Sequence, residues 1–121
     1  MMIYLNSEHE ARYKILIKKS GMIHEDRERQ SLFYLVAGNS DLYKQVDKIY
    51  DFKEQQLKCM TDGQVDFSNI YTSSSSKSLL LLAIQLYNNG TDITVIETFK
   101  YLDADTAQIA LNAIKIRYKI E

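Results

Sequence analysis

The chain has 121 residues, enough for one domain with a hydrophobic core of its own. Its 45% hydrophobic and 26% charged residues are typical of an ordinary globular protein and exclude a disordered chain. The 15 basic and 16 acidic residues give a formal net charge of −1, which disfavours a dedicated nucleic-acid binder.

The cysteine count and the apolar runs indicate where such a chain resides. Cys59 is the only cysteine, so no intramolecular disulfide forms, which fits a reducing cytosol. The first residues have neither a basic flank nor a long apolar run, so we expect no signal peptide. The apolar run 79–87 is too short to span a bilayer and is interrupted by Gln85. We therefore expect a cytoplasmic protein with no membrane contact.

The absence of proline and the presence of only four glycines favour helices. The first predicted helix covers 8–19. Ser7 and Glu10 have the spacing of a capping box at its start, and Gly21 supplies its end. His9 falls on the apolar face of this helix, where a hydrogen-bonded core histidine is the common outcome.

A second helix is predicted from about 26 to 37, ending at Gly38-Asn39, and a third from about 41 to 50, capped by Ser40. The short link between them makes the pair a helical hairpin or corner. Glu28 and Arg29 lie on the apolar side of the second helix, where they form an ion pair or engage Arg117.

The segment 51–71 has no clear helical period. Thr61-Asp62-Gly63 is a turn signal between two short alternating stretches. We favour an irregular excursion that holds a small β-hairpin within 56–67. The alternative is a continuation of the third helix through Lys58.

The serine cluster 73–78 marks the start of a fourth helix, about 75–88, which is apolar on nearly every side. We predict it to be the central element of the fold. A fifth helix, 92–102, is expected to bury Ile93, Val95, Ile96, Phe99 and Leu102 on one side. Asp103 or Asp105 caps a sixth, well-buried helix that runs to about Tyr118. The fold class is all-α, a single globular domain over 1–121 with about six helices.

The serine cluster is also the best candidate for a ligand site. Helix N-termini attract anions, so Ser74, Ser75, Ser76 and Lys77 form a candidate phosphate or carboxylate site. The glycine-rich loop of most phosphate sites is missing, however, so we favour a plain helix cap with solvated serines.

Motifs for metal binding and catalysis are missing from the sequence. There is no His-x-x-x-His or Cys-x-x-Cys spacing and no carboxylate cluster, so we expect no metal and no cofactor. Cys59 has no histidine nearby in the sequence and is interpreted as a small packing residue. No catalytic residue is assigned.

Nine tyrosines are the unusual feature of the composition. Tyrosine combines apolar area with a polar tip and is enriched at protein interfaces. We expect Tyr4, Tyr71 and Tyr101 to be exposed and to be candidate interface residues. The last two helices could be read as a helix-turn-helix, but the acidic start of the second one disfavours DNA recognition.

Several motifs together resemble a family of small Firmicute proteins of unknown function, often met in phage or mobile-element contexts. The motifs that carry this resemblance lie at 28–39, 41–43, 49–52, 86–88 and 112–117. The resemblance implies a bacterial cytoplasmic accessory protein and brings no activity, cofactor or catalytic residue with it.

Three functions are therefore open. The leading hypothesis is a non-enzymatic protein–protein interaction or accessory module with a protein partner or a homo-oligomeric state. The second is a nucleic-acid-associated regulator that uses a local basic face of the first helix and the C-terminal tail. The third is a small-anion binder or hydrolase at the serine-capped helix.

Overall fold

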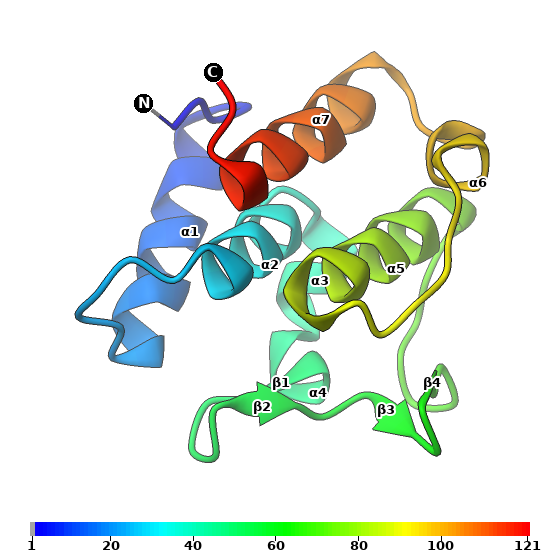
Figure 1. Cartoon of the computed structure of the whole chain (residues 1–121), viewed down its shortest axis with the longest axis horizontal. Coiled ribbons are helices and arrows are strands. Elements are labelled where there is room, and N and C mark those ends of the chain that lie inside the picture. Colours follow the sequence, from blue (N-terminus) through cyan, green and yellow to red (C-terminus); the bar gives the residue numbers. More distant parts are fainter. Residues whose placement is uncertain (1) are drawn as a thin grey trace.

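The computed structural model describes residues 2–121; Met1, which the expected 1–121 domain includes, lies outside the described residues. These residues form seven helices and four two-residue strands (Figure 1). In chain order they are α1 (Ser7–Ser20), α2 (Arg27–Ala37), α3 (Ser40–Lys44), α4 (Val46–Ile49), β1 (Tyr50–Asp51), β2 (Gln56–Leu57), β3 (Met60–Thr61), β4 (Gln64–Val65), α5 (Ser74–Asn88), α6 (Val95–Phe99) and α7 (Ala104–Tyr118). The fold is mostly helical, as predicted.

Helix α1 begins at Ser7, one residue earlier than predicted. Asn6, not Ser7, is the N-cap, and its side-chain oxygen accepts a hydrogen bond from the backbone N–H of His9 at 2.8 Å. The Ser7–Glu10 capping box was therefore wrong, because asparagine caps as well as serine does. Gly21 ends the helix in the left-handed region at φ 67°, as expected.

The middle of the fold is held by α2. It packs against α1, α3, α5 and α7, and every residue from 31 to 37 is buried. In Figure 1 it lies between α1 on one side and α5 on the other, beneath α7. The prediction that 75–88 forms the central helix is not confirmed. α5 is deeply buried, but it lies beside α2 and leaves one edge to α6.

The predicted third helix is broken into α3 and α4. Gln45 has φ −113° and ψ 18°, outside helical values, and separates the two short helices. Asn39 caps α3 in place of the predicted Ser40. The continuation through Lys58 is wrong, since the chain turns at Tyr50 into β1, which pairs antiparallel with β2.

The predicted hairpin is present as β3 and β4, which pair antiparallel through Met60 with Val65 and Thr61 with Gln64. The two turn residues, Asp62 and Gly63, both have positive φ, 53° and 78°. That is the geometry of the tight hairpin turn for which Asp-Gly is favoured.

Helices α5 and α7 follow their predictions closely. Ser73 caps α5 through a reciprocal hydrogen-bonding pair with Ser76, and Asp103 caps α7. α7 is less buried than expected, because Leu111 is exposed on its outer side. One structural observation bears on the expectation that the protein makes no membrane contact. Within residues 2–121, no helix combines the length and the apolar character that a bilayer crossing requires.

Candidate interaction surface around α6

Helix α6 is half the length predicted for 92–102. Thr94 caps it through a capping box: the Glu97 N–H donates to Thr94 Oγ1 at 3.1 Å, and the Thr94 N–H donates to Glu97 Oε1 at 3.0 Å. These hydrogen bonds, led by the backbone bond at Thr94, lower the pKa of Glu97, so its carboxylate stays charged. The helix therefore has a defined start although only five residues follow it.

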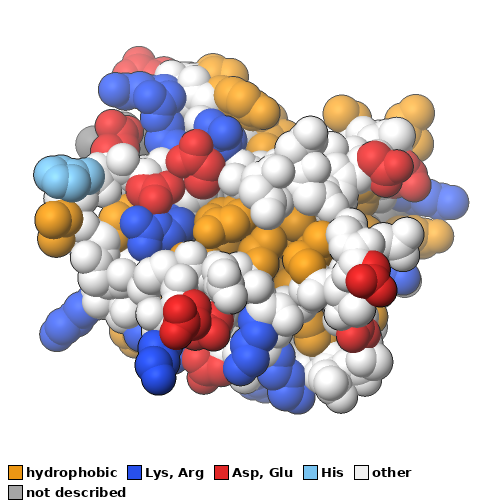
Figure 2. Space-filling model, turned by 60° about the horizontal axis from the view of Figure 1, so that its bottom comes forward, with side chains coloured by type: hydrophobic (Ala, Val, Ile, Leu, Met, Phe, Trp, Pro, Cys, Tyr) orange, Lys and Arg blue, Asp and Glu red, His pale blue; other side chains and the backbone are white. Residues whose placement is uncertain are grey.

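The apolar side chains of α6 face outward. Val95 and Ile96 are 74% and 80% exposed, and Tyr101, just after the helix, is 56% exposed. The prediction that Val95 and Ile96 are buried is wrong, because the short helix packs inward through Thr98 and Phe99 instead. In Figure 2 several apolar side chains project at the right-hand edge of the molecule, where α6 lies, beside acidic and basic ones. We call Val95, Ile96 and Tyr101 the α6 ridge.

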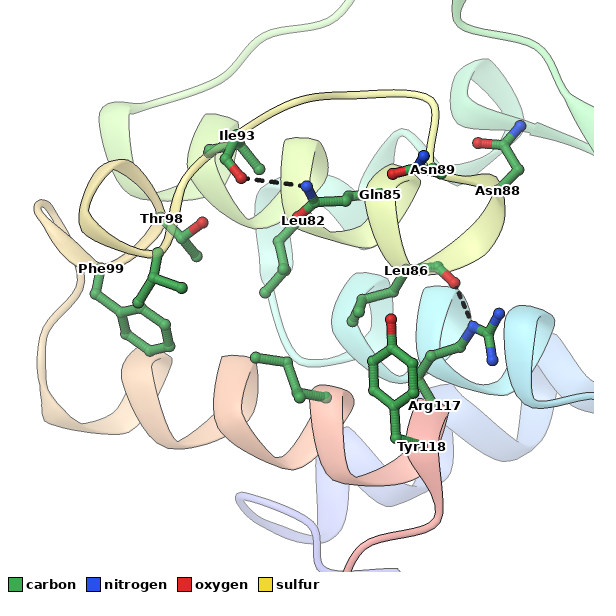
Figure 3. A pocket seen from close by; sticks show the side chains of 12 residues that line it. Leu82, Gln85, Leu86, Asn88, Asn89, Ile93, Thr98, Phe99, Arg117 and Tyr118 are labelled. Carbon is green, nitrogen blue, oxygen red and sulfur yellow. Dashed lines mark hydrogen bonds between the residues drawn. The ribbon is translucent and has the colours of Figure 1, made fainter.

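A cleft of about 620 Å³ lies on one side of the ridge, between α5 and α7. Figure 3 shows Leu82 and Leu86 reaching into it from α5, Phe99 closing one end and Tyr118 standing at the other. Val95 belongs to its lining, so the ridge and the cleft form one continuous surface. Its volume lies in the range of small-molecule and side-chain pockets, about 300–1,000 Å³.

Side-chain hydrogen bonds fix the walls of the cleft. Gln85 Nε2 donates to the carbonyl of Ile93 at 3.2 Å, which ties the segment before α6 to α5 (Figure 3). Arg117 Nε donates to the carbonyl of Leu86 at 2.7 Å, near the C-terminal end of α5. A helix leaves its last carbonyls without backbone partners, so this contact both caps α5 and joins it to α7.

The structure shows which partners Glu28 and Arg29 of α2 have, and the partner of Glu28 lies beside the cleft. Arg117 Nη2 lies 3.5 Å from Glu28 Oε1, so Glu28 engages Arg117 as one alternative predicted. Arg29 pairs with Asp26 at 2.6 Å rather than with Glu28. Arg117 thus connects the ends of α2, α5 and α7 beside the cleft.

A second hollow of about 440 Å³ lies on the other side of α6. Two residues of the predicted anion site, Ser74 and Lys77, line it together with Tyr101 of the ridge. Its charges are mixed, because Asp92 and Glu97 face it as well as Lys77 and Lys100.

The other serines of the cluster contact one another at the start of α5. Ser76 is buried and exchanges hydrogen bonds with Ser73, and Ser75 Oγ lies 3.2 Å from Ser73 Oγ. Lys77 Nζ lies over the ring of Phe67, 4.9 Å from its centre. These contacts fit the helix cap that the sequence favoured.

The three candidate interface tyrosines lie in different surroundings. Tyr71 is exposed, and its backbone N–H and C=O are both bound by the side chain of Gln45. Tyr4 is half-buried, with its ring 5.4 Å from that of His9 and 5.8 Å from that of Tyr13. Only Tyr101 joins a larger apolar surface.

Three of the four basic side chains of α1 lie next to an acidic side chain. Arg12 lies 2.9 Å from Glu8, Lys14 lies 3.0 Å from Glu10, and Lys19 lies 2.8 Å from Asp47. A face composed of such pairs offers little net positive charge to a phosphate backbone.

The cysteine and the buried histidine, which could act in catalysis or metal binding, lie in the interior of the fold. Cys59 is buried, and its burial raises the pKa of the thiol to about 11, which keeps it protonated and unreactive at neutral pH. His9 is buried with both ring nitrogens hydrogen-bonded. Within residues 2–121, no three His, Cys, Asp or Glu side chains come close enough together to hold a metal ion.

Sequence reasoning missed the cleft and the outward face of α6. The available signal was the Thr94–Glu97 spacing, which marks a helix start at Val95, three residues after the one assumed. The cleft itself had no sequence signal, because its walls come from three separate segments, 82–89, 93–99 and 114–118, that only the fold brings together.

Comparisons with known proteins complete the description of the site. The model of a family of unknown function, DUF6075, matches residues 1–121. A search of curated proteins and a search of solved structures each found no match to this chain. Because the match covers the whole sequence, the chain belongs to the DUF6075 family.

Proposed function

We propose that this protein is a helical protein–protein interaction module that binds another polypeptide through the α6 ridge and the adjoining cleft. The observation that carries the proposal is the exposure of Val95 and Ile96 on a helix that is properly capped. The accessory role in a bacterial cytoplasm that the sequence resemblance implies belongs to the same proposal.

The energetics support a binding surface. Fully burying one Val or Ile side chain contributes about 1.5–3 kcal/mol, so the ridge offers two such anchors side by side. Binding energy in interfaces concentrates in a few central apolar residues that fit pockets. A ridge next to a preformed cleft has this form, and Figure 3 shows the apolar side chains that would receive a partner's anchors.

The chemistry of the cleft supports a non-enzymatic role. Among the described residues, Arg117 is the one charged side chain in its lining, and it is already bound to the carbonyl of Leu86. General acid–base or nucleophilic catalysis requires a titratable group held within reach of a second one. The regulator and anion-binding alternatives have less support, given the paired cations of α1 and the self-satisfied serine cap.

The test compares two isoleucines. Ile96→Asp alters the ridge, while Ile23→Asp changes an equally exposed isoleucine, 87% exposed, in the link between α1 and α2. Each variant and the unchanged protein are tagged and used to capture partners, either native-host proteins or a co-expressed untagged copy. Thermal melting establishes that both variants fold.

We expect the unchanged protein and Ile23→Asp to retain the same partner chains and Ile96→Asp to lose them. A charged side chain in an apolar contact must be desolvated without a partner, which weakens binding strongly. Retention of the same partners by all three proteins would contradict the proposal.

A further inference from the structure

We infer that the hollow of about 440 Å³ beside α6 is a binding site for a free α-amino acid with an aliphatic side chain. Such a ligand carries a positive and a negative charge on neighbouring groups, and the walls of the hollow carry charges of both signs as well. The site goes beyond the proposed function and does not depend on the contact of the α6 ridge with another polypeptide.

The first observation is the hydroxyl of Ser78, which lines the hollow. Ser78 is 6% exposed, yet its hydroxyl forms no hydrogen bond with another described residue. Within residues 2–121, no fully enclosed polar side-chain atom lacks a hydrogen-bond partner, so the Ser78 oxygen lies at the small part of the residue that stays accessible. A hydroxyl so nearly removed from water needs a partner, and a ligand carboxylate in the hollow can accept its hydrogen.

The second observation is that the charges around the hollow are not paired with one another. Lys77 and Lys100 form no ion pair with a described residue. Their ammonium groups lie over the rings of Phe67 and Tyr101, 4.9 and 5.3 Å from the ring centres, and such contacts leave the positive charge in place. The carboxylate of Asp92 also has no partner among the described residues. The hollow therefore offers free charges of both signs.

The third observation is that the acidic wall of the hollow is fastened to α5. Thr91 Oγ1 donates to the carbonyl of Leu81 at 2.7 Å. Gln85 Nε2 donates to the carbonyl of Ile93 at 3.2 Å. Asp92 lies between these two bound residues, so its backbone is held on both sides and the acid stays near the helix.

The two walls suit the two charged groups of an amino acid. Ser74, Lys77 and Ser78 lie on one face of the first two turns of α5, near the positive end of the helix, so this wall suits the carboxylate. Asp92 suits the ammonium group. Glu97 is less available, because its Oε1 already accepts a hydrogen bond in the α6 cap. A simple anion would leave Asp92 without a partner and would be repelled by it.

Apolar side chains complete the hollow. Leu81 and Ile93 are half-buried in its lining, so they offer contact area to an aliphatic side chain without contributing a charge. The volume of about 440 Å³ lies in the range of small-molecule pockets, about 300–1,000 Å³. An amino acid such as leucine therefore matches the hollow in charge and in polarity.

The first experiment titrates the full chain with three ligands that share one carbon skeleton, using backbone amide NMR shifts to obtain each Kd. L-Leucine carries both charges, L-leucinamide only the positive one and isocaproate only the negative one. We expect saturable shifts around the hollow with L-leucine. Each analogue should bind at least about tenfold more weakly, because it leaves one charged wall unpaired. No saturable binding of L-leucine, or an analogue that binds as tightly, overturns the inference.

The second experiment repeats the titrations with Asp92→Asn. L-Leucine should bind at least about tenfold more weakly, whereas isocaproate should bind equally well or more tightly, because the variant removes a repulsive charge. The matched control is Asp62→Asn, an exposed aspartate in the β3–β4 turn, which should leave both affinities unchanged. A folding defect weakens both ligands alike, so opposite responses identify a direct contact. Equal weakening of both ligands, or the same loss in the control, overturns the inference.

The third experiment tests the carboxylate end with Ser78→Ala. Binding of L-leucine and of isocaproate should weaken about tenfold, because a hydrogen bond to a charged group is lost. Binding of L-leucinamide, which has no carboxylate, should not change. Thermal melting establishes that the variant folds. Unchanged binding of L-leucine in Ser78→Ala, or an equal loss for all three ligands, contradicts the assigned role of the hydroxyl.

Discussion

His9 is a buried histidine with hydrogen-bond partners at both ring nitrogens. It is 2% exposed, its Nδ1 accepts a hydrogen bond from the Leu5 N–H at 3.0 Å, and its Nε2 lies 2.9 Å from the carbonyl of Tyr34. A carbonyl only accepts, so Nε2 carries the proton and the ring is neutral. Burial is the main reason that the pKa of His9 is lowered, and the nearby Arg12 cation lowers it further.

The lowered pKa of His9 predicts a pH-dependent stability. An unfolded histidine binds a proton near pH 6.5, whereas folded His9 stays neutral to lower pH, so the unfolded state binds more protons. The free energy of unfolding should therefore fall between pH 7.5 and 5.5, by at most about 1.4 kcal/mol per pH unit for this group. Urea unfolding at both pH values measures the difference.

The chain supplies a matched control for His9. His9→Gln should reduce the pH dependence, while His24→Gln, which changes an exposed histidine, should leave it in place. An identical pH dependence in His9→Gln and the unchanged protein would disprove the assignment. The window lies above the usual carboxyl range, so acidic groups contribute little to it.

At the scale of single elements, caps and turns decide where helices and strands end. Three helices begin after a capping residue whose side chain accepts a hydrogen bond from the backbone N–H three residues later. These capping residues are Asn6, Thr94 and Asp103. Gln45 instead lies where a helical stretch is interrupted. Its side chain binds both the N–H and the C=O of Tyr71, 26 residues away, at the point where the helical stretch 40–49 breaks.

The β3–β4 hairpin gives a prediction at this scale. Gly63 has φ 78°, so Gly63→Ala should lower the free energy of unfolding by about 1–2 kcal/mol, since a Cβ is strained in the left-handed region. Gly63→Asn should lose less, because asparagine tolerates that region. Urea unfolding of both variants makes the measurement.

The surroundings of Gly63 show why Gly63→Ala would lower the free energy of unfolding. Open space surrounds the position that a Cβ at Gly63 would occupy, so a loss comes from backbone strain and not from crowding. Equal stability of Gly63→Ala and the unchanged protein would show that the turn adopts another conformation.

At the scale of the whole molecule, α2 joins the elements that are distant in sequence. Tyr34 donates its hydroxyl hydrogen to the carbonyl of Ile3 and accepts one from Asn112 Nδ2 at 3.0 Å. One side chain of α2 thereby connects the N-terminal segment to α7. The close approach at the end of α2 depends on Gly38, whose Cβ position lies 3.0 Å from Ile109 Cδ1 and 3.2 Å from His9 Nε2.

Gly38 gives the prediction for this packing. Gly38→Ala should lower the free energy of unfolding by about 1–3 kcal/mol, because the added methyl group overpacks the junction of α1, α2 and α7. Ile109→Val removes the nearest methyl group and should recover part of the loss. Thermal or urea unfolding of both single variants and the double variant gives the coupling energy. Strictly additive effects would contradict the proposed crowding.

Local sequence signals predicted the helical class, the ends of α1, α5 and α7, and the hairpin turn. They worked there because capping and turn formation depend on residues only two to four positions apart. The same reasoning chose wrong caps for α1 and α3, where adjacent residues compete for one role. It also placed the start of α6 too early, although a capping signal was present.

The candidate site was predicted only in part. Ser74, Lys77 and Tyr101 do line one hollow, but the spacing of the sequence did not indicate that Tyr101 belongs beside the start of α5. Exposure of Val95 and Ile96 was missed, because their apolar character is the usual sign of burial. The proposed interaction rests on the same apolar character on an outward face.

The sequence by itself determined that the chain is mostly helical, where α1, α5 and α7 end, and where the β3–β4 hairpin turns. These features follow from local hydrogen bonding and from residue chemistry. Only the tertiary structure decided that α2, not α5, holds the centre, and that a ridge and a cleft lie side by side around α6. Such features depend on which of several apolar faces pack together, and that choice is made by the whole core at once.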